Sequence, residues 1–198
     1  MNSLPFSSAA ERNRQPILDE LMKLIPHNGS VLEIGSGTGQ HAVFLTQNLP
    51  DLLWQPSDRE ENLAALQERL SAEGNTNILP PIKLDVLLDR WPDYCYDAVF
   101  SANTAHIMPW RAVRAMFAGV STRLENPARF CLYGPFNIDN RFTSPGNAQF
   151  DARLRAEDSR MGIRDVGMLE ALAEMYEMEL ESRVPMPANN FILVFKKL

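Results

Sequence analysis

Short apolar runs alternate with amphipathic stretches along most of the chain. The runs are rich in β-branched and aromatic residues, which favours strands, and they cover residues 30–34, 52–55, 78–84, 96–101, 128–133, 180–184 and 191–197. Apolar residues at helical spacing predict helices over residues 16–25, 40–48, 60–72, 111–124 and 166–177. Strands that alternate with helices predict a mostly parallel sheet with helices on both faces.

The last two predicted strands break this alternation. Only residues 185–190, a short segment rich in Pro and Asn, separate them, whereas a parallel connection needs a crossover of about a dozen residues or more. We therefore expect an antiparallel C-terminal hairpin, with the last strand inserted next to the fifth. The expected architecture is one α/β domain over residues 1–198, built on a seven-stranded, mostly parallel sheet.

Composition narrows the class of protein. The 198 residues are 45% hydrophobic and 22% charged, which fits one folded domain. A formal net charge of −6 disfavours nucleic acid as a partner, since such binding relies on Lys and Arg. Cys95 and Cys131 are far apart and are expected to be buried free thiols. No signal-like or membrane-spanning apolar stretch is evident, so we expect a cytoplasmic protein.

Three glycines at alternate positions follow the first predicted strand. Gly35, Gly37 and Gly39 lie where a strand turns into a helix, so a ligand could approach the backbone closely and meet the free N–H groups of the helix. A dinucleotide-binding loop would carry Gly or Ala where Gln40 stands. This difference and the terminal hairpin disfavour an NAD-dependent oxidoreductase, and no Gly-Lys-Ser/Thr marks a P-loop. A glycine turn that only tightens packing is the alternative.

Two aspartates follow the next strands. Asp58, 19 residues after Gly39, can accept hydrogen bonds from both hydroxyls of a ribose, although it could instead cap the following helix. Asp85 could meet the exocyclic amine of an adenine with Val86 and Leu87 beside the ring, although a solvated turn is the alternative. Open α/β sheets bind ligands at the carboxyl ends of their strands, so these residues are expected to share one site.

Motifs over nearly the whole chain point to one family. The residues from Glu33 to Gly39 match the E/D-x-G-x-G-x-G pattern of class I S-adenosylmethionine-dependent methyltransferases. Further motifs are Ser8-Ala9-Ala10-Glu11-Arg12-Asn13, Gly37-Thr38-Gly39-Gln40-His41, Trp54-Gln55-Pro56-Ser57-Asp58, Ala102-Asn103, His106-Ile107, Tyr133-Gly134-Pro135-Phe136, Asn147, Phe150-Asp151, Gly162-Ile163-Arg164-Asp165 and Pro187-Ala188-Asn189-Asn190. Together they resemble the domain of unknown function 938 family, which includes proteins called methyltransferase-like 26.

The resemblance implies a Rossmann-like methyltransferase fold with S-adenosylmethionine as cofactor. Gly35 stands where we expect alanine in that family, which brings the loop nearer to the general methyltransferase pattern. The positions that match cofactor-binding residues are Glu33, Gly35, Ser36, Gly37, Thr38, Gly39, Asp58, Asp85, Val86 and Asn103.

The segment after the fourth strand lies beside the transferred methyl group in this fold. Asn103 is expected to hold the methionine part of the cofactor or the substrate. His106 is the candidate general base, because imidazole titrates near neutral pH, and a structural hydrogen-bonding role is its alternative. His41 is expected to cap or pack at the first helix after the glycines, or to line the pocket. The histidines lack carboxylates at ligand spacing, which disfavours a metal site.

Candidate contacts to the methyl acceptor come from several segments. Trp110, Tyr133 and Phe136 could face the cationic sulfonium, with burial in the core as the alternative. Residues 137–151 have no helical period and are expected to form a loop over the site, within a substrate-side insertion over residues 137–165. Residues 1–15 are expected to form an N-terminal lid, in which Ser8 and Glu11 also fit a capping box. The resemblance adds Arg12, Asn13, Arg141, Asp151, Arg164 and Asn189.

Two functional hypotheses follow. The first is methyl transfer to a small-molecule acceptor, which the arginines suggest is acidic unless they pair with neighbouring carboxylates. The second is a non-catalytic protein that binds S-adenosylmethionine or S-adenosylhomocysteine for regulation or interaction. The sequence indicates neither the acceptor nor an oligomeric state.

Overall fold

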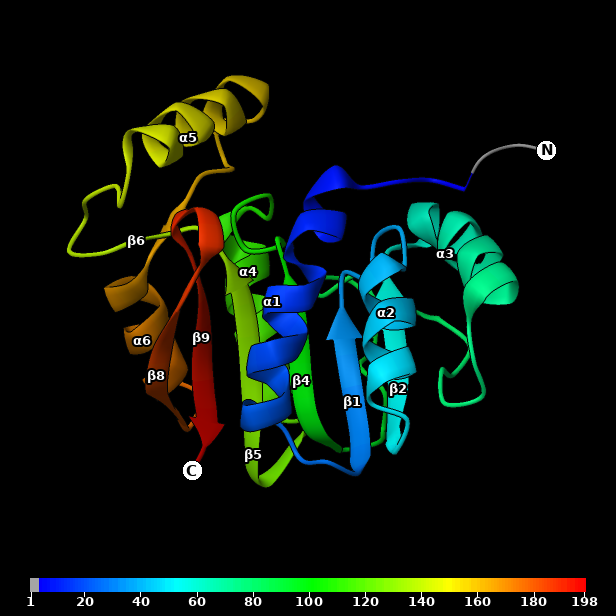
Figure 1. Cartoon of the computed structure of the whole chain (residues 1–198). Helices are drawn as coiled ribbons and strands as arrows, with labels where there is room; N and C mark the ends of the chain where they lie inside the picture. The colour runs from blue at the N-terminus through cyan, green and yellow to red at the C-terminus, as the bar shows by residue number, and fades with distance from the viewer. Residues whose placement is uncertain (1–3) are drawn as a thin grey trace.

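A seven-stranded sheet forms the centre of the computed structural model, which describes residues 4–198 (Figure 1). The strand order is β3-β2-β1-β4-β5-β9-β8. The first five strands in this order, from β3 through β2, β1 and β4 to β5, run parallel. β9 pairs antiparallel with both β5 and β8. The strands are β1 (Gly29–Ile34), β2 (Leu52–Asp58), β3 (Ile82–Lys83), β4 (Tyr96–Ala102), β5 (Leu124–Gly134), β8 (Met178–Met186) and β9 (Asn190–Lys197). The α/β class, the seven strands and the position of the last strand are confirmed.

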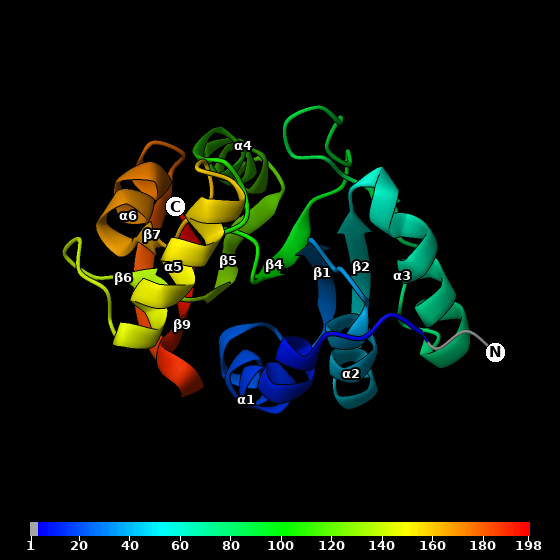
Figure 2. The ribbon, with the colours of Figure 1, turned by 90° about the horizontal axis from the view of Figure 1, so that it is seen from above.

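Helices cover both faces of this sheet. α1 (Ser8–Leu24) and α2 (Gln40–Asn48) lie on one face, and α4 (Trp110–Ser121) and α6 (Val166–Glu174) on the other (Figure 2). α3 (Glu60–Glu73) flanks the β2–β3 edge of the sheet, while α5 (Pro145–Glu157) lies above the β5 and β9 side of the sheet (Figures 1 and 2). A short parallel pair, β6 (Phe136–Asn137) and β7 (Arg164–Asp165), leads to and from α5, and η1 (Pro187–Asn189) joins β8 to β9.

The sheet separates two apolar cores, because successive residues of a strand point to opposite faces. On β4, Val99 packs into the core beneath α4 and α6, whereas Phe100 packs into the core beneath α1 and α2. The α4 side contains the aromatic group of Phe117, Phe130 and Phe195, whose ring centroids lie 5.0 to 6.0 Å apart. These cores hold the sheet rigid beneath the loops at its carboxyl end.

The structure corrects the prediction of a loop over residues 137–151, because α5 begins at Pro145. Ser144 caps this helix by accepting a hydrogen bond from the Asn147 N–H at 3.1 Å, and proline suits the first helical position. The buried residues of α5 are Asn147, Asp151 and Leu154. They have helical spacing, but two of the three are polar, so the hydrophobic pattern did not show the helix.

Two other elements differ in length from the prediction. The third strand is reduced to Ile82–Lys83, with one isolated bridge before it, because prolines at positions 80 and 81 lack the N–H that regular pairing requires. The first helix begins at Ser8 instead of residue 16. Its cap is Ser7, which accepts from the Ala10 N–H at 3.3 Å, so the predicted capping box is wrong by one position.

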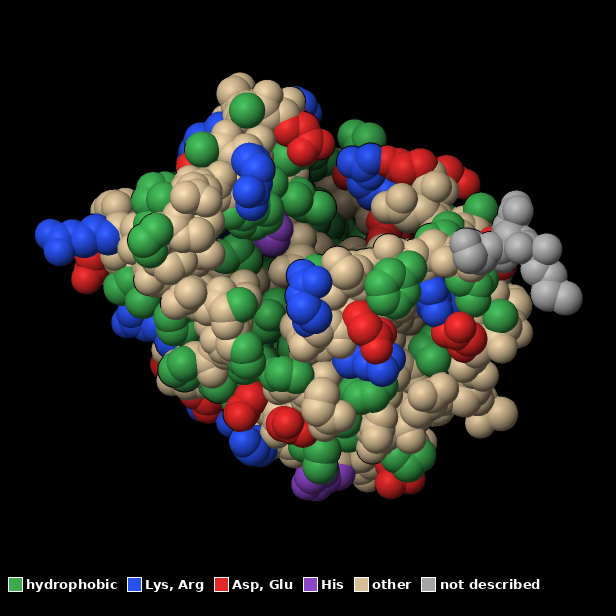
Figure 3. All heavy atoms as spheres, turned by 45° about the horizontal axis from the view of Figure 1, so that its top comes forward, with side chains coloured by type: hydrophobic (Ala, Val, Ile, Leu, Met, Phe, Trp, Pro, Cys, Tyr) green, Lys and Arg blue, Asp and Glu red, His purple; other side chains and the backbone are tan. Residues whose placement is uncertain are grey.

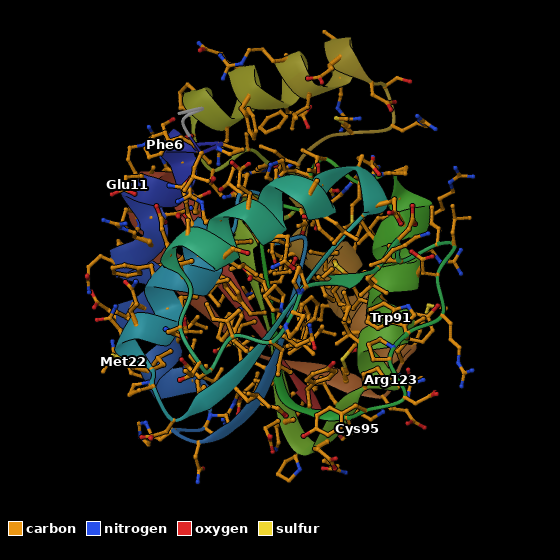
Figure 4. The ribbon with its side chains drawn as sticks, turned by 90° about the vertical axis from the view of Figure 1, so that its right-hand side faces the viewer. Phe6, Glu11, Met22, Trp91, Cys95 and Arg123 are labelled. Atoms are coloured by element: carbon orange, nitrogen blue, oxygen red, sulfur yellow. The ribbon has the colours of Figure 1, made fainter. Side chains whose placement is uncertain are left out.

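Figure 4 shows Trp91, Cys95 and Arg123 on the α4 side of the molecule, away from Phe6 and Glu11. A Cβ atom on Gly119 of α4 would lie 2.0 Å from the Trp91 ring, so glycine is required for this ring to pack against the helix.

Both cysteines are free thiols; Cys131 is buried as predicted, whereas Cys95 is only half-buried. Within residues 4–198, no helix combines the length and apolar character needed to cross a bilayer.

Candidate functional site

A cavity of about 640 Å³ opens at the carboxyl ends of β1, β2 and β4. Figure 3 shows the hollow in the molecular surface at this end of the sheet. Of the residues predicted to hold a cofactor, six line it: Gly35, Gly37, Asp58, Asp85, Val86 and Asn103. The sequence interpretation did not include most of the other lining residues, which are Ile34, Arg59, Asn62, Leu84, Leu87, Leu88, Ala102, Thr104, Ile107, Met108, Pro109, Arg111, Ala112, Asp158, Arg160 and Met161.

The glycine loop is held in a conformation that glycine adopts easily. Gly35, Gly37 and Gly39 have φ angles of 74°, 54° and 75°, a region that other residues seldom adopt. Ser57 of β2 fixes the loop, because its carbonyl accepts from the N–H groups of Gly35 and Ser36 at 3.0 Å each. A Cβ on Gly37 would meet nothing within 4 Å, so the loop presents bare backbone to the cavity at this position.

Asp58 is buried and tightly held at the cavity wall. Its Oδ2 accepts from the Gly37 N–H at 2.6 Å, and its Oδ1 accepts from the Asn62 amide at 2.7 Å and the Arg59 N–H at 2.8 Å. The carboxylate therefore couples the glycine loop to α3. Sequence reasoning missed Asn62, although its position four residues after Asp58 at the start of a predicted helix was a usable signal.

Glu33 lies behind the glycine loop and not in the cavity wall. It is buried, and its Oε2 accepts from the Ser36 hydroxyl at 2.9 Å and the Trp54 indole N–H at 3.0 Å. Burial raises the pKa of Glu33 from 4.5 to about 7, despite the opposing hydrogen bonds from these two partners. Ser36, Thr38 and Gly39 are also outside the cavity lining.

Replacing Glu33 with Gln is expected to flatten the pH dependence of stability. The folded protein keeps a proton on Glu33 that the unfolded chain releases, so wild-type stability should fall by about 3 kcal/mol as the pH rises from 4.5 to 7. The Gln carbonyl can occupy the Oε2 position and keep both hydrogen bonds. Urea unfolding at pH 5 and pH 8 should show a smaller loss for Glu33→Gln than for wild type; equal losses would contradict the buried, protonated carboxyl.

The loop after β4 contributes Asn103 to the cavity lining, whereas His106 is not among the lining residues. Asn103 has a φ of 59° and lines the cavity. His106 is buried, does not line the cavity and packs edge-to-face on Phe150 of α5 at 5.2 Å. Burial and the nearby Arg164 charge lower the pKa of His106 to about 4, so it is neutral at neutral pH. Its role as a general base remains a prediction.

Several predicted acceptor residues meet beside the cavity, at the carboxyl end of β5. His41 Nε2 lies 2.7 Å from Asn13 Oδ1. Burial raises the pKa of Tyr133, and Asn13 and the charge of Arg12 oppose this rise. Tyr133 is buried, whereas Arg12 is exposed. None of these four side chains lines the 640 Å³ cavity itself.

Arg164 ties two walls of the cavity together. Its guanidinium donates to the carbonyls of Ala105 at 3.0 Å and Arg160 at 2.9 Å, and also to that of Met108. The loop after β4 is thereby joined to the loop after α5. The neighbouring Asp151 pairs with Arg155 at 2.6 Å. The hydrogen-bond acceptors of Arg164 are therefore backbone carbonyls and not this carboxylate.

The other predicted acceptor residues do not meet in the cavity. Trp110 is half-buried with the Arg164 guanidinium 6.0 Å from its ring centroid, and Phe136 belongs to the core. Arg141 is exposed, and the exposed Asn189 accepts from the Asn147 amide at 3.1 Å through its carbonyl. Among residues 4–198, no three His, Cys, Asp or Glu side chains are arranged to hold a metal ion.

Residues 4–7 form an extended N-terminal strap over α2 and α3. The Arg69 guanidinium donates to the Pro5 carbonyl at 2.6 Å, and Gln40 Oε1 accepts from the Ser7 N–H at 2.6 Å. Gln40 therefore anchors the strap at the position where a dinucleotide-binding loop has a small residue. Residues 1–3 of the predicted lid lie outside the described residues, and none of residues 4–15 lines the cavity.

Several solved structures with a similar fold are methyltransferases. An O-methyltransferase family protein from Burkholderia thailandensis matches with a TM-score of 0.81 at 14% identity, covering 96% of this chain and 57% of that one. An O-methyltransferase family 2 protein from Planctomyces limnophilus, in complex with apigenin, gives 0.79 at 14% identity, covering 96% and 60%. The calicheamicin-biosynthesis methyltransferase CalO1, bound to S-adenosylhomocysteine, gives 0.74 at 16% identity, covering 96% and 56%.

The chain thus has the Rossmann-like fold of class I methyltransferases and spans somewhat more than half the length of these proteins. Residues 4–197 match the family described as protein of unknown function DUF938, and the chain belongs to it. The predicted fold and family are confirmed.

Proposed function

We propose that this protein transfers a methyl group from S-adenosylmethionine to a small-molecule acceptor. The observation that carries the proposal is the open cradle at Gly37 beside the fixed carboxylate of Asp58. Asp58 would accept from the ribose hydroxyls, and Asp85 with Val86, on the same cavity wall, would meet the adenine. Asn103 would face the methionine part. The cavity is within the size range of small-molecule sites, roughly 300–1,000 Å³.

The chain would contribute mainly alignment. The bound cofactor would supply an electrophilic methyl group, and holding a nucleophile in line with it can provide much of the rate enhancement. The cavity lining within residues 4–198 contains no His, Cys, Lys, Tyr or Glu. Asp158 is a poor base there, because Arg160 lowers its pKa to about 2. We therefore propose an acceptor whose nucleophilic atom needs no deprotonation by the cavity wall.

Two structural neighbours support the proposed ligands. CalO1 was solved with S-adenosylhomocysteine, and the Planctomyces limnophilus protein with apigenin, a small molecule. Their similarity to this chain is one of fold, so the cofactor and the acceptor class need a direct test.

Transfer of radiolabelled methyl from S-adenosylmethionine into a metabolite extract tests the proposal. We expect label in a small-molecule product with the wild-type protein and with Asp51→Ala, a control at an exposed aspartate at the opposite end of β2. Asp58→Ala should strongly reduce it, because the variant binds the cofactor more weakly. Retained transfer in His106→Asn would exclude His106 as an essential base. Cofactor binding without any labelled product would instead support the non-catalytic alternative.

A further inference from the structure

The cavity extends beyond the residues assigned to the cofactor. Those residues follow β3, β2, β1 and β4, so the cofactor would run along the sheet order from Asp85 to Asn103. Further lining comes from two segments, within residues 107–112 and 158–161. The first leads into α4, which packs against β5 and α6, and the second follows α5, above the β5 and β9 side of the sheet (Figure 2). These segments form the part of the cavity left for an acceptor.

The two segments make one wall with an apolar surface. The Arg164 guanidinium donates to the carbonyls of Met108 and Arg160, which joins the loop after β4 to the loop after α5. Ile107, Met108 and Met161 line the cavity from this wall. The Ile107 side chain is aliphatic yet 47% exposed. Covering such a surface removes apolar area from water, so the wall favours a ligand with an apolar body.

Three arginines line the same cavity, and they differ in their partners. Arg160 pairs with Asp158 at 2.7 Å, and Arg59 pairs with Glu61. Arg111 forms no salt bridge or side-chain hydrogen bond in the part of the chain that the structure describes. A guanidinium can bind a carboxylate through two parallel hydrogen bonds. Arg111 is therefore the lining cation that remains available to an anionic group of the ligand.

We propose that the methyl acceptor is an apolar carboxylic acid and that its carboxylate receives the methyl group. The apolar body would cover Ile107, Met108 and Met161, and Arg111 would orient the carboxylate. The inference rests on the proposed methyl transfer and names its substrate class. It also accounts for a cavity lining without a suitable base, because a carboxylic acid with a pKa of about 4 is already ionised at neutral pH.

The transfer balances without a proton. One carboxylate oxygen attacks the methyl carbon of the bound sulfonium, the new O–C bond forms as the C–S bond breaks, and the bonding pair stays on sulfur. An anion and a cation are converted into a neutral methyl ester and a neutral thioether. The ester has lost the charge that Arg111 binds, so the product is held less strongly than the acceptor.

Alkaline hydrolysis of the labelled product tests the acceptor class. The wild-type protein is incubated with radiolabelled S-adenosylmethionine and a metabolite extract, and the small-molecule product is then treated with mild alkali. We expect the label to be released as volatile methanol, because methyl esters hydrolyse under these conditions whereas methyl ethers and methylamines do not. Label that stays in the product would overturn the carboxylate acceptor and leave methyl transfer in place. Absence of any labelled product would instead overturn the proposed function.

A pair of variants on α4 tests the role of Arg111. Arg111→Gln should lower ester formation at limiting extract about tenfold, since hydrogen bonds between charged groups are lost. Arg114→Gln, at an exposed arginine three residues later that does not line the cavity, should match the wild-type protein. The affinity for S-adenosylhomocysteine should be unchanged in both variants. Undiminished ester formation in Arg111→Gln, or a loss of its affinity for S-adenosylhomocysteine, would overturn the assignment of Arg111 to the acceptor.

Discussion

Asp58→Ala is expected to weaken S-adenosylhomocysteine binding about 100-fold. The substitution removes the proposed acceptor for two ribose hydroxyls, and a loss of two hydrogen bonds to a charged group amounts to about 3 kcal/mol. It also removes the partner that holds the Gly37 N–H at 2.6 Å and the Asn62 amide at 2.7 Å, so the loop would lose its fixed position. Isothermal titration calorimetry measures the change.

The control for this prediction is Asp51→Ala, which removes an exposed aspartate in the turn immediately before β2. Its affinity should equal that of the wild-type protein. Thermal unfolding of both variants separates a binding defect from a folding defect. An Asp58→Ala protein that is folded and binds within threefold of wild type would show that the ribose does not lie at this carboxylate.

Gly37→Ala and Gly39→Ala are expected to have different effects, although both residues have positive φ. The new Cβ at position 37 enters open space, while that at position 39 lies 2.8 Å from Leu66 Cδ1. Gly37→Ala should therefore cost about 1 kcal/mol of stability from its backbone conformation. It should weaken cofactor binding roughly 10- to 100-fold, because overpacking costs about 1–3 kcal/mol.

Gly39→Ala should instead lose more stability, because the buried Leu66 side chain must move to accept the added methyl group. Chemical denaturation and titration with S-adenosylhomocysteine on the same preparations give both quantities. If Gly37→Ala bound the ligand as tightly as wild type, the bare backbone at this position would not be the cofactor cradle.

The sequence was sufficient to predict the parts of the site that depend on strand ends. Gly37, Asp58 and Asp85 each follow a different parallel strand, and the carboxyl ends of such strands meet at one edge of the sheet. Their common position in one cavity follows from that geometry. Gln40, which disfavoured a dinucleotide loop in the sequence interpretation, anchors the N-terminal strap by accepting from the Ser7 N–H.

The remaining features depend on tertiary contacts that no local pattern shows. α5 is buried through Asn147 and Asp151 as well as Leu154, so hydrophobic periodicity did not reveal it; the Ser144-Pro145 pair was the available signal. The burial of His106 against Phe150 depends on the packing of α5, a contact between residues far apart in the sequence. Ser57 binds the glycine loop through its main-chain carbonyl. Any residue can make such a bond, so the amino-acid sequence does not predict it.

Titration of the wild-type protein with S-adenosylhomocysteine in a calorimeter is the decisive measurement for the cofactor site. A slot formed by Gly37, Asp58 and Asp85 predicts saturable heat with one ligand per chain, and a rise in melting temperature as the ligand concentration increases. A folded protein that gives neither heat nor a thermal shift with this compound or with S-adenosylmethionine would contradict the assignment of the cavity.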